Sequence, residues 1–253
     1  METKKILSVF FSIVLLLCIA ACSDDNDPAY YKVPVKLEYE NGYSINYEYD
    51  DKLHLIKMEY KDVENNIVIS SDMTYDMQGR VSHIKVADTS VEEYEFTYDG
   101  NKISVNQLNS YTQTIETNNK GQLVRISGYE DPGQEFRYLY DSRGNINEEA
   151  SYNNGEFIRK SIYLYDSKNG YSRNINSPVW ISYYNGLDML LPGKVNNEIN
   201  ESEYKAKDSG IQEITKATYE YDEENYPIKA VFYDAGGEVM NQLTISYESR
   251  LMK

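Results

Sequence analysis

One short unit dominates the sequence and constrains what it can fold into. It occupies residues 43–60 (YSINYEYDDKLHLIKMEY), and variants of it recur almost to the end of the chain. Apolar residues alternate with polar ones from Tyr43 to Tyr49 and again from Ile56 to Tyr60, which is the period of a strand with one buried face. A turn separates the two runs, so the unit predicts a β-hairpin with one apolar and one polar face.

A Tyr-Asp dipeptide marks the end of the first strand in each unit. Neighbouring copies are 19 to 26 residues apart, except for one last step of 56 residues. The copies begin at Tyr49, Tyr75, Tyr98, Tyr140, Tyr165 and Tyr221, with a degenerate copy at Thr117. A period near 23 residues is one hairpin plus its return turn, so the repeat predicts a chain of antiparallel hairpins. No Pro/Gly/Ser-rich linker interrupts the repeat, which indicates one domain.

The turn after each dipeptide has a recognisable chemistry. Asp76-Met77-Gln78-Gly79 and Asp141-Ser142-Arg143-Gly144 both place Asp first and Gly fourth. Asp accepts backbone N–H bonds and Gly takes a positive φ, so these residues predict a type I turn closed by a G1 bulge. Leu53 stands at the glycine position of the first turn, where a positive φ costs about 1 kcal/mol. We therefore expect a different turn there.

The turns at the opposite ends of the hairpins are less regular in sequence, for example Asn153-Asn154-Gly155 and Glu130-Asp131-Pro132-Gly133. Recognition is usually carried by variable loops on a regular scaffold. A binding surface is therefore expected at this variable edge of the sheet.

Residues 177–197 interrupt the repeat and account for most of the extra length of the 56-residue step. Ser177 and Pro178 are typical of a helix N-terminus, and apolar residues follow at helical spacing until Pro192-Gly193. They are Trp180, Tyr183, Tyr184, Leu187, Leu190 and Leu191. We predict a short amphipathic helix over residues 177–191 that covers the sheet; the alternative is a loop whose apolar residues plug the core. Trp180, Tyr183 and Tyr184 form the candidate binding surface, because they are the aromatic cluster outside the repeat.

The N-terminus is typical of a secretory signal. Lys4 and Lys5 precede an apolar run over residues 6–21, which is shorter than the roughly 20 residues of a membrane span. Ile19-Ala20-Ala21-Cys22 resembles the lipobox of bacterial lipoproteins, in which the cysteine is acylated before cleavage. The resemblance implies lipid attachment at Cys22; the alternative is an ordinary cleaved signal with an incidental cysteine.

The residues after Cys22 are acidic: Ser23, Asp24, Asp25, Asn26 and Asp27. They resemble the signal that sends Bacteroidota lipoproteins to the exterior face of the outer membrane. The alternative is that this acidic run is a solvated linker. The expected organisation is a lipoprotein signal peptide over 1–21, an acidic tether over 22–32, and a β domain over 33–253 with an insertion at 177–197.

Composition excludes several functions. The net charge of −16 argues against nucleic acid and anionic head groups as partners. His54 and His83 have no His or Cys partner at metal-ligand spacing, and no glycine-rich loop precedes a helix, so we predict no metal and no cofactor. A glycosidase needs two carboxylates about 5 to 10 Å apart. With 41 acidic residues, the sequence cannot select such a pair.

The chain has 26 tyrosines, which admit two interpretations. They could stack on sugar rings as a carbohydrate platform, or they could pair across strands as structure, at about 0.2 to 1 kcal/mol per pair. Because many stand at equivalent places in the repeat, such as Tyr75 and Tyr140, the structural interpretation is favoured.

The motif Tyr-Asp-x-x-Gly followed by a polar and an apolar residue, present at residues 75–81 and 140–146, resembles the YD repeat of Rhs-type proteins. Together with the lipobox, it is similar to a group of Bacteroidota surface lipoproteins built of short YD arrays. Rhs proteins wrap long arrays around a toxin. With about seven units and no toxin-like segment, that function does not carry over.

The sequence thus predicts an all-β domain of antiparallel β-hairpin repeats, forming one long twisted, curled sheet that is open barrel-like or solenoid-like. For function, we favour a non-enzymatic binding or adhesion module for a glycan or a protein, anchored to the outer membrane and facing the cell exterior. A glycan-directed hydrolase using paired carboxylates and a purely structural envelope protein remain alternatives.

Overall fold

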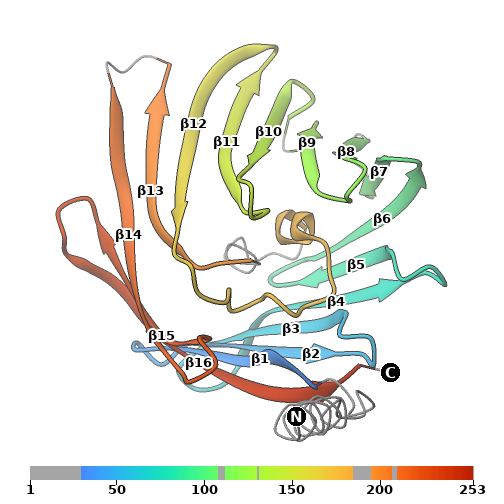
Figure 1. The fold of residues 1–253 in the computed structure, drawn as a ribbon. Coiled ribbons are helices and arrows are strands. Elements are labelled where there is room, and N and C mark those ends of the chain that lie inside the picture. Colours follow the sequence, from blue (N-terminus) through green and yellow to red (C-terminus); the bar gives the residue numbers. More distant parts are fainter. Residues whose placement is uncertain (1–29, 108–111, 130, 185–194, 207–209, 253) are drawn as a thin grey trace, which may run out of the picture. The chain divides into compact units, whose positions relative to one another are not determined.

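The chain folds into an all-β barrel (Figure 1). The computed structural model describes residues 30–107, 112–129, 131–184, 195–206 and 210–252. Within these ranges the chain forms sixteen strands. They are β1 (Tyr30–Tyr39), β2 (Ser44–Tyr49), β3 (Leu55–Lys61), β4 (Ile67–Tyr75), β5 (Val81–Ala87), β6 (Val91–Asp99), β7 (Lys102–Gln107), β8 (Gln113–Thr117), β9 (Leu123–Ser127), β10 (Gln134–Tyr140), β11 (Ile146–Asn153), β12 (Glu156–Tyr165), β13 (Glu198–Lys205), β14 (Ile211–Tyr221), β15 (Pro227–Asp234) and β16 (Val239–Leu251).

The strands follow one another around the barrel in sequence order, and β1 lies between β2 and β16. The prediction of an antiparallel hairpin array is therefore confirmed, and the sheet is closed. Closure removes the unpaired N–H and C=O groups that the two edges of an open sheet would expose. The closing strand β1 begins at Tyr30, so its first three residues come from the stretch predicted to be tether.

The predicted turn hydrogen bonds form at Asp76, Asn118 and Asp141, but not at Asp166, whose N–H donates to the Asn197 carbonyl (3.0 Å). In the β10–β11 turn, the Asp141 N–H donates to the Asn145 carbonyl (2.9 Å) and the Gly144 N–H donates to the Asp141 carbonyl (3.1 Å). The Asp141 carboxylate accepts the backbone N–H groups of Arg143 (2.8 Å) and Asn145 (3.0 Å). The strand register shifts between Leu139 and Tyr140, as a G1 bulge requires.

The prediction of a different turn at Leu53 is wrong. The Leu53 N–H donates to the Asp50 carbonyl (3.1 Å), as glycine does in the other turns, and Leu53 has a φ of 63°. Its side chain is only 2% exposed. Burying a leucine contributes roughly 1.5 to 3 kcal/mol, which exceeds the backbone cost of about 1 kcal/mol. Burial therefore decides the conformation at this position.

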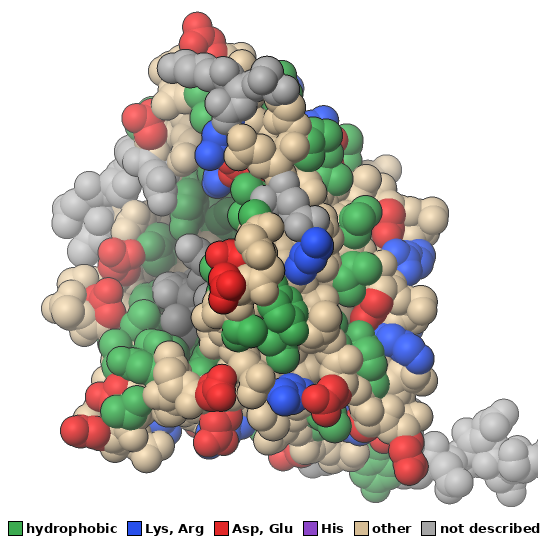
Figure 2. Space-filling view, turned by 90° about the vertical axis from the view of Figure 1, so that its left-hand side faces the viewer, with side chains coloured by type: hydrophobic (Ala, Val, Ile, Leu, Met, Phe, Trp, Pro, Cys, Tyr) green, Lys and Arg blue, Asp and Glu red, His purple; other side chains and the backbone are tan. Residues whose placement is uncertain are grey.

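The buried core residues of the strands point into the barrel, whereas charged residues and some apolar ones, such as Leu139 and Leu164, are exposed. The most deeply buried strand residues, including Leu55, Met58, Ile84, Val105, Ile115 and Ile126, belong to one continuous core. Outward-facing charges pair across strands, as Arg125 does with Glu116 (3.0 Å). On the face seen in Figure 2, acidic and basic side chains are interspersed among apolar ones. The barrel thus has an apolar core, and its exterior carries charged side chains.

The described part of the insertion does not form the predicted helix that covers the sheet, and residues 185–191 of that prediction lie outside the described part of the chain. Of the predicted helix, the described residues form only a 3-10 helix, η1 (Val179–Tyr183), which lies inside the ring of strands (Figure 1). Ser177 is not its N-cap: its hydroxyl accepts the N–H of Leu55 (2.9 Å) and bonds the Tyr75 hydroxyl (2.8 Å). The plug alternative describes the insertion better. No helix in the described part of the chain is long and apolar enough to cross a bilayer.

Candidate functional site

Some of the residues predicted to be functional lie outside the described part of the chain. These are the lipid-attachment residue Cys22 and the export-signal residues Ser23, Asp24, Asp25 and Asp27. Their roles stay predictions.

The predicted binding surface of Trp180, Tyr183 and Tyr184 is part of the core. Trp180 is 2% exposed and Tyr184 is 1% exposed. Both rings pack against Phe96 on β6, with centroid distances of 5.0 Å and 5.5 Å. This packing leaves no face of Trp180 or Tyr184 open to a ligand, so we look for the site elsewhere.

Tyr183 anchors η1 to the barrel wall. Its hydroxyl donates to the Glu149 carboxylate on β11 (2.8 Å) and accepts a hydrogen bond from Tyr138. Its carbonyl accepts the Tyr129 hydroxyl (2.7 Å). Burial raises the pKa of Glu149, although the hydrogen bond from Tyr183 opposes that shift. These contacts identify Tyr183 as a structural residue.

Tyrosines of the repeat tie neighbouring strands together at the rim formed by the Tyr-Asp turns. The hydroxyls of Tyr75, Tyr98 and Tyr165 each donate to the carbonyl of the first residue of the preceding strand, at 2.9, 2.8 and 2.6 Å. Burial raises the pKa of all three hydroxyls, so they stay protonated donors. Tyr140 differs, because its buried hydroxyl lacks a hydrogen-bond partner of good geometry among the described residues. Burial raises the pKa of this hydroxyl, and the Leu123 backbone opposes that shift. This pattern favours the structural interpretation of the repeat tyrosines.

The two histidines are separate from each other. His54 is 4% exposed, stacks on Tyr75 at 4.3 Å, and its Nδ1 lies 2.8 Å from the Asp50 carboxylate. His83 faces outward, with its Nε2 3.5 Å from Glu93. Among the described residues, no three His, Cys, Asp or Glu side chains are grouped to hold a metal ion.

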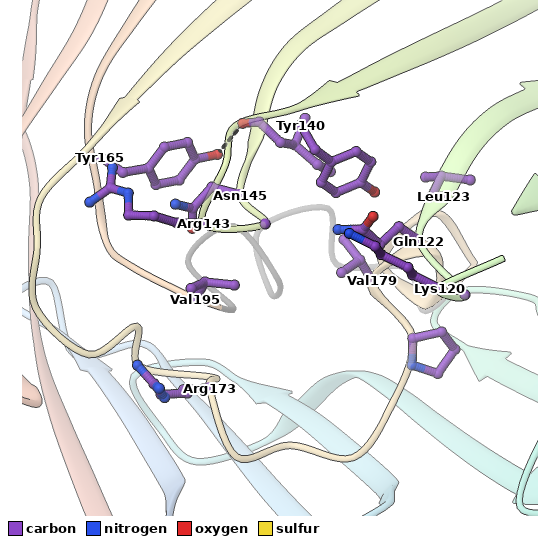
Figure 3. A pocket seen from close by; sticks show the side chains of 14 residues that line it. Lys120, Gln122, Leu123, Tyr140, Arg143, Asn145, Tyr165, Arg173, Val179 and Val195 are labelled. Atoms are coloured by element: carbon purple, nitrogen blue, oxygen red, sulfur yellow. Dashed lines mark hydrogen bonds between the residues drawn. The ribbon is translucent and has the colours of Figure 1, made fainter. Parts of the chain in front are cut away.

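A cavity of about 430 Å³ opens at the rim of the Tyr-Asp turns; we call it the mouth pocket. Figure 3 shows its lining side chains. They come from the β8–β9 turn, the β10–β11 turn, the end of β12, the connection that follows β12, and the insertion. The lining residues are Lys120, Gly121, Gln122, Leu123, Tyr140, Arg143, Gly144, Asn145, Ile146, Tyr165, Arg173, Pro178, Val179 and Val195. We expected a binding surface at the less regular rim, whereas this pocket lies at the regular one.

The turn geometry explains why Lys120 and Arg143 line the pocket. Each is the third residue of an Asx turn, whose backbone N–H donates to the side-chain oxygen of Asn118 (2.9 Å) or Asp141 (2.8 Å). The backbone of this residue is therefore fixed while its side chain is exposed at the rim. Gly144 follows with a φ of 96°, and a Cβ there would stand 3.9 Å from Val195 of the insertion. The turn thus packs closely against the insertion.

The insertion is fixed to the pocket by a buried amide pair. The Asn145 side chain donates to Asn196 Oδ1 (3.1 Å) and accepts the Asn196 N–H (3.0 Å). It also donates to the Asp141 carboxylate (3.0 Å). This network joins the β10–β11 turn to the chain segment that leads into β13, so the pocket wall is preformed.

The pocket has an apolar floor and a basic rim. Leu123, Ile146, Pro178, Val179 and Val195 supply apolar surface, whereas Lys120, Arg143 and Arg173 carry the charges. No lining residue is Asp or Glu. Ligand pockets typically measure about 300 to 1,000 Å³ and combine an apolar lining with a few polar groups. The mouth pocket meets this description.

The buried carboxylates lie elsewhere in the barrel. Burial and the charge of Glu201 raise the pKa of Glu198 to about 8. Neither residue lines the mouth pocket, and neither does Glu149. The lining of the mouth pocket therefore contains no two-carboxylate arrangement.

Comparison with known proteins gives no family. No family model matches the chain, and no curated protein matches it either. Among solved structures, a porin-like protein from Bacteroides vulgatus is 13% identical, with a TM-score of 0.41 over 86% of this chain and 99% of that one. A porin-like protein from Bacteroides uniformis is 11% identical, with a TM-score of 0.41 over 88% and 99%. A TcdB2-TccC3-Cdc42 structure is 9% identical, with a TM-score of 0.24 over 79% of this chain and 13% of that one. Likeness of this degree carries no functional argument.

The basic residues of the pocket were missed in the sequence. Lys120 and Arg143 occupy the same turn position on consecutive Tyr-Asp units, and this equivalence was a usable signal. Arg173 gave none, because its approach to those turns depends on the path of the chain between β12 and η1.

Proposed function

We propose that this protein is a lipid-anchored surface lipoprotein that acts as a non-enzymatic binding module, and that it binds a glycan in the mouth pocket. The observation that carries the proposal is the preformed cavity of about 430 Å³, with its apolar floor and polar rim. Tyr140 and Tyr165 present aromatic rings in its wall, a surface on which sugar rings can pack.

Anchoring by lipid agrees with the side-chain pattern of the barrel. Membrane-spanning barrels carry an apolar band outside and polar residues inside. In this barrel the core residues face inward and charged pairs such as Lys57 with Glu59 (2.6 Å) lie on the exterior. This pattern supports a barrel held at the membrane by acyl chains on Cys22, rather than one that spans it with strands.

The anchor has a direct test. Cys22→Ser should abolish incorporation of a labelled fatty acid, and protease added to intact cells should degrade the unchanged protein if it faces the exterior. Full labelling of the Cys22→Ser variant would refute the anchor. Protection of the unchanged protein until the outer membrane is opened would refute the exterior orientation.

The binding function is tested with the full-length protein in detergent and a panel of glycans and surface proteins. We expect dissociation constants in the millimolar to micromolar range for a subset of the glycans. No glycan binding at millimolar ligand would refute the proposal. A protein ligand that competes with no glycan would replace it by the protein-binding form of the module.

A glycan hydrolase is the weaker alternative, because the lining of the pocket contains no carboxylate. Release of reducing ends that disappears in Glu198→Gln or Glu201→Gln would revive it. A purely structural envelope role would show as altered envelope integrity after deletion, with a purified protein that binds nothing.

A further inference from the structure

The charge of the mouth pocket is opposite to that of the chain. The sequence has 41 acidic and 25 basic residues. Among the lining residues, three are basic and none is acidic. The wall of this cavity is therefore positively charged, whereas the protein as a whole is negatively charged. A positively charged wall favours a negatively charged ligand.

The three cations reach the cavity from separate segments. Lys120 belongs to the β8–β9 turn, Arg143 to the β10–β11 turn and Arg173 to the connection between β12 and η1. Figure 3 shows their side chains around the opening, with Arg143 and Arg173 on one side and Lys120 on the other. A ligand in the cavity would meet positive charge from more than one direction.

The existing contacts leave donors for a ligand. Arg143 uses Nη1 to donate to the Asp166 carbonyl (2.6 Å), and its Nε lies 3.4 Å from the Asp141 carboxylate. Arg173 uses Nη1 to donate to the Asn169 side chain (3.0 Å). Each guanidinium has five N–H donors, so further donors remain on both. Lys120 has no ion pair among the described residues and is exposed. Contacts to neighbouring backbone and amide groups also hold the two arginines in place, which lowers the entropy cost of binding.

We infer that the mouth pocket selects glycans that carry a carboxylate or a sulfate, through Lys120, Arg143 and Arg173. This inference rests on the proposed function, because it names the class of glycan that the same pocket binds. Guanidinium groups match the geometry of such anions with two parallel N–H donors, and lysine adds a point charge. The apolar floor and the tyrosine rings then contact the uncharged part of the sugar.

The test compares matched pairs of sugars that differ only in charge. Galacturonic acid oligomers against galactose oligomers, and sulfated against unsulfated glucosamine oligomers, are titrated calorimetrically into the full-length protein in detergent. Inorganic sulfate is titrated alone as a third probe. We expect the acidic member of at least one pair to bind tenfold or more tightly than its neutral counterpart.

Substitutions of the basic lining residues test whether the preference for acidic sugars comes from the mouth pocket. Lys120→Gln and Arg143→Gln should each weaken acidic-sugar binding by roughly 10- to 100-fold, the range for loss of a hydrogen bond to a charged group. Lys52→Gln is the matched control, because Lys52 holds the same third position of an Asx turn (N–H to Asp50 Oδ1, 2.8 Å) but does not line the pocket. It should bind like the unchanged protein. Because Arg143 also holds the Asp166 carbonyl, the thermal midpoint of each variant is measured alongside, and Lys120→Gln supplies a change without that contact.

The possible results distinguish a failure of the charge selectivity from a failure of glycan binding itself. Equal binding of neutral and acidic partners would overturn the charge selectivity and leave glycan binding intact. Binding of inorganic sulfate as tightly as of any sugar would mean an adventitious anion only, and would overturn the inference. An acidic preference that survives in Lys120→Gln and Arg143→Gln would move the site away from this pocket. No binding of any sugar would overturn both proposals.

Discussion

Replacing Trp180 by alanine tests whether the insertion is core. Trp180 is 2% exposed, and its ring lies 5.0 Å from Phe96 and 6.3 Å from Tyr184. A buried aromatic side chain removes about 150 to 250 Å² from water, which at ~25 cal/mol per Å² gives about 4 to 6 kcal/mol as an upper bound. Substitutions of this kind cost about 3 to 5 kcal/mol. We therefore expect Trp180→Ala to lose about 3 to 5 kcal/mol of unfolding free energy.

Urea unfolding followed by far-UV circular dichroism measures this loss without a tryptophan signal. With a urea dependence of about 3 kcal/mol per molar, the midpoint should fall by about 1 to 1.7 M. Phe157→Ala is the control, because Phe157 lies on the exterior with its ring half-buried against Tyr204 at 5.9 Å. It should lose much less. A Trp180→Ala midpoint within about 0.3 M of the unchanged protein, or a loss no larger than that of Phe157→Ala, would refute the plugged barrel.

Three further perturbations follow from the fold. Leu53→Gly should be about 1 kcal/mol more stable than Leu53→Ala in urea, because both lose the buried side chain but only glycine relieves the positive φ; the opposite order would contradict the turn. Tyr98→Phe should cost about 1 to 2 kcal/mol, because it leaves the Val81 carbonyl unpaired inside the barrel, and an unchanged urea midpoint would count against that bond. Burial and Glu201 raise the pKa of Glu198 from 4.5 to about 8, so between these pH values the folded chain keeps a proton that the unfolded chain has lost, and stability falls as pH rises. Glu198→Gln should flatten that part of the stability–pH curve, and an unchanged slope would contradict the assignment.

The hairpin repeat could be predicted because it depends on residues that are close together in the sequence. Alternation within each strand fixes which side chains share a face, and Asp141 with Gly144 fixes a turn through hydrogen bonds that span only four residues. Closure of the sheet into a barrel could not be predicted in the same way. It depends on pairing β1 with β16, at opposite ends of the chain, and no local pattern reports on that pairing.

The failures have a common physical origin in tertiary burial. Leu53 adopts a disfavoured φ because burial of its side chain in the core stabilises the fold by more than the φ costs. Trp180 and Tyr184 stand at helical spacing, but inside a barrel a loop can meet apolar surface on several sides, so the spacing did not require a helix. The pocket could be predicted only in part: Lys120 and Arg143 share a turn position, whereas Arg173 joins them through the folded path of the chain between β12 and η1.

A crystal structure of the protein with the acidic glycan that binds it most tightly would show directly where the sugar lies. We expect electron density for the sugar in the mouth pocket, with its carboxylate or sulfate within hydrogen-bond distance of Arg143, Arg173 or Lys120. Sugar bound on the outer face of the barrel or at the opposite rim, with the mouth pocket empty, would contradict this expectation.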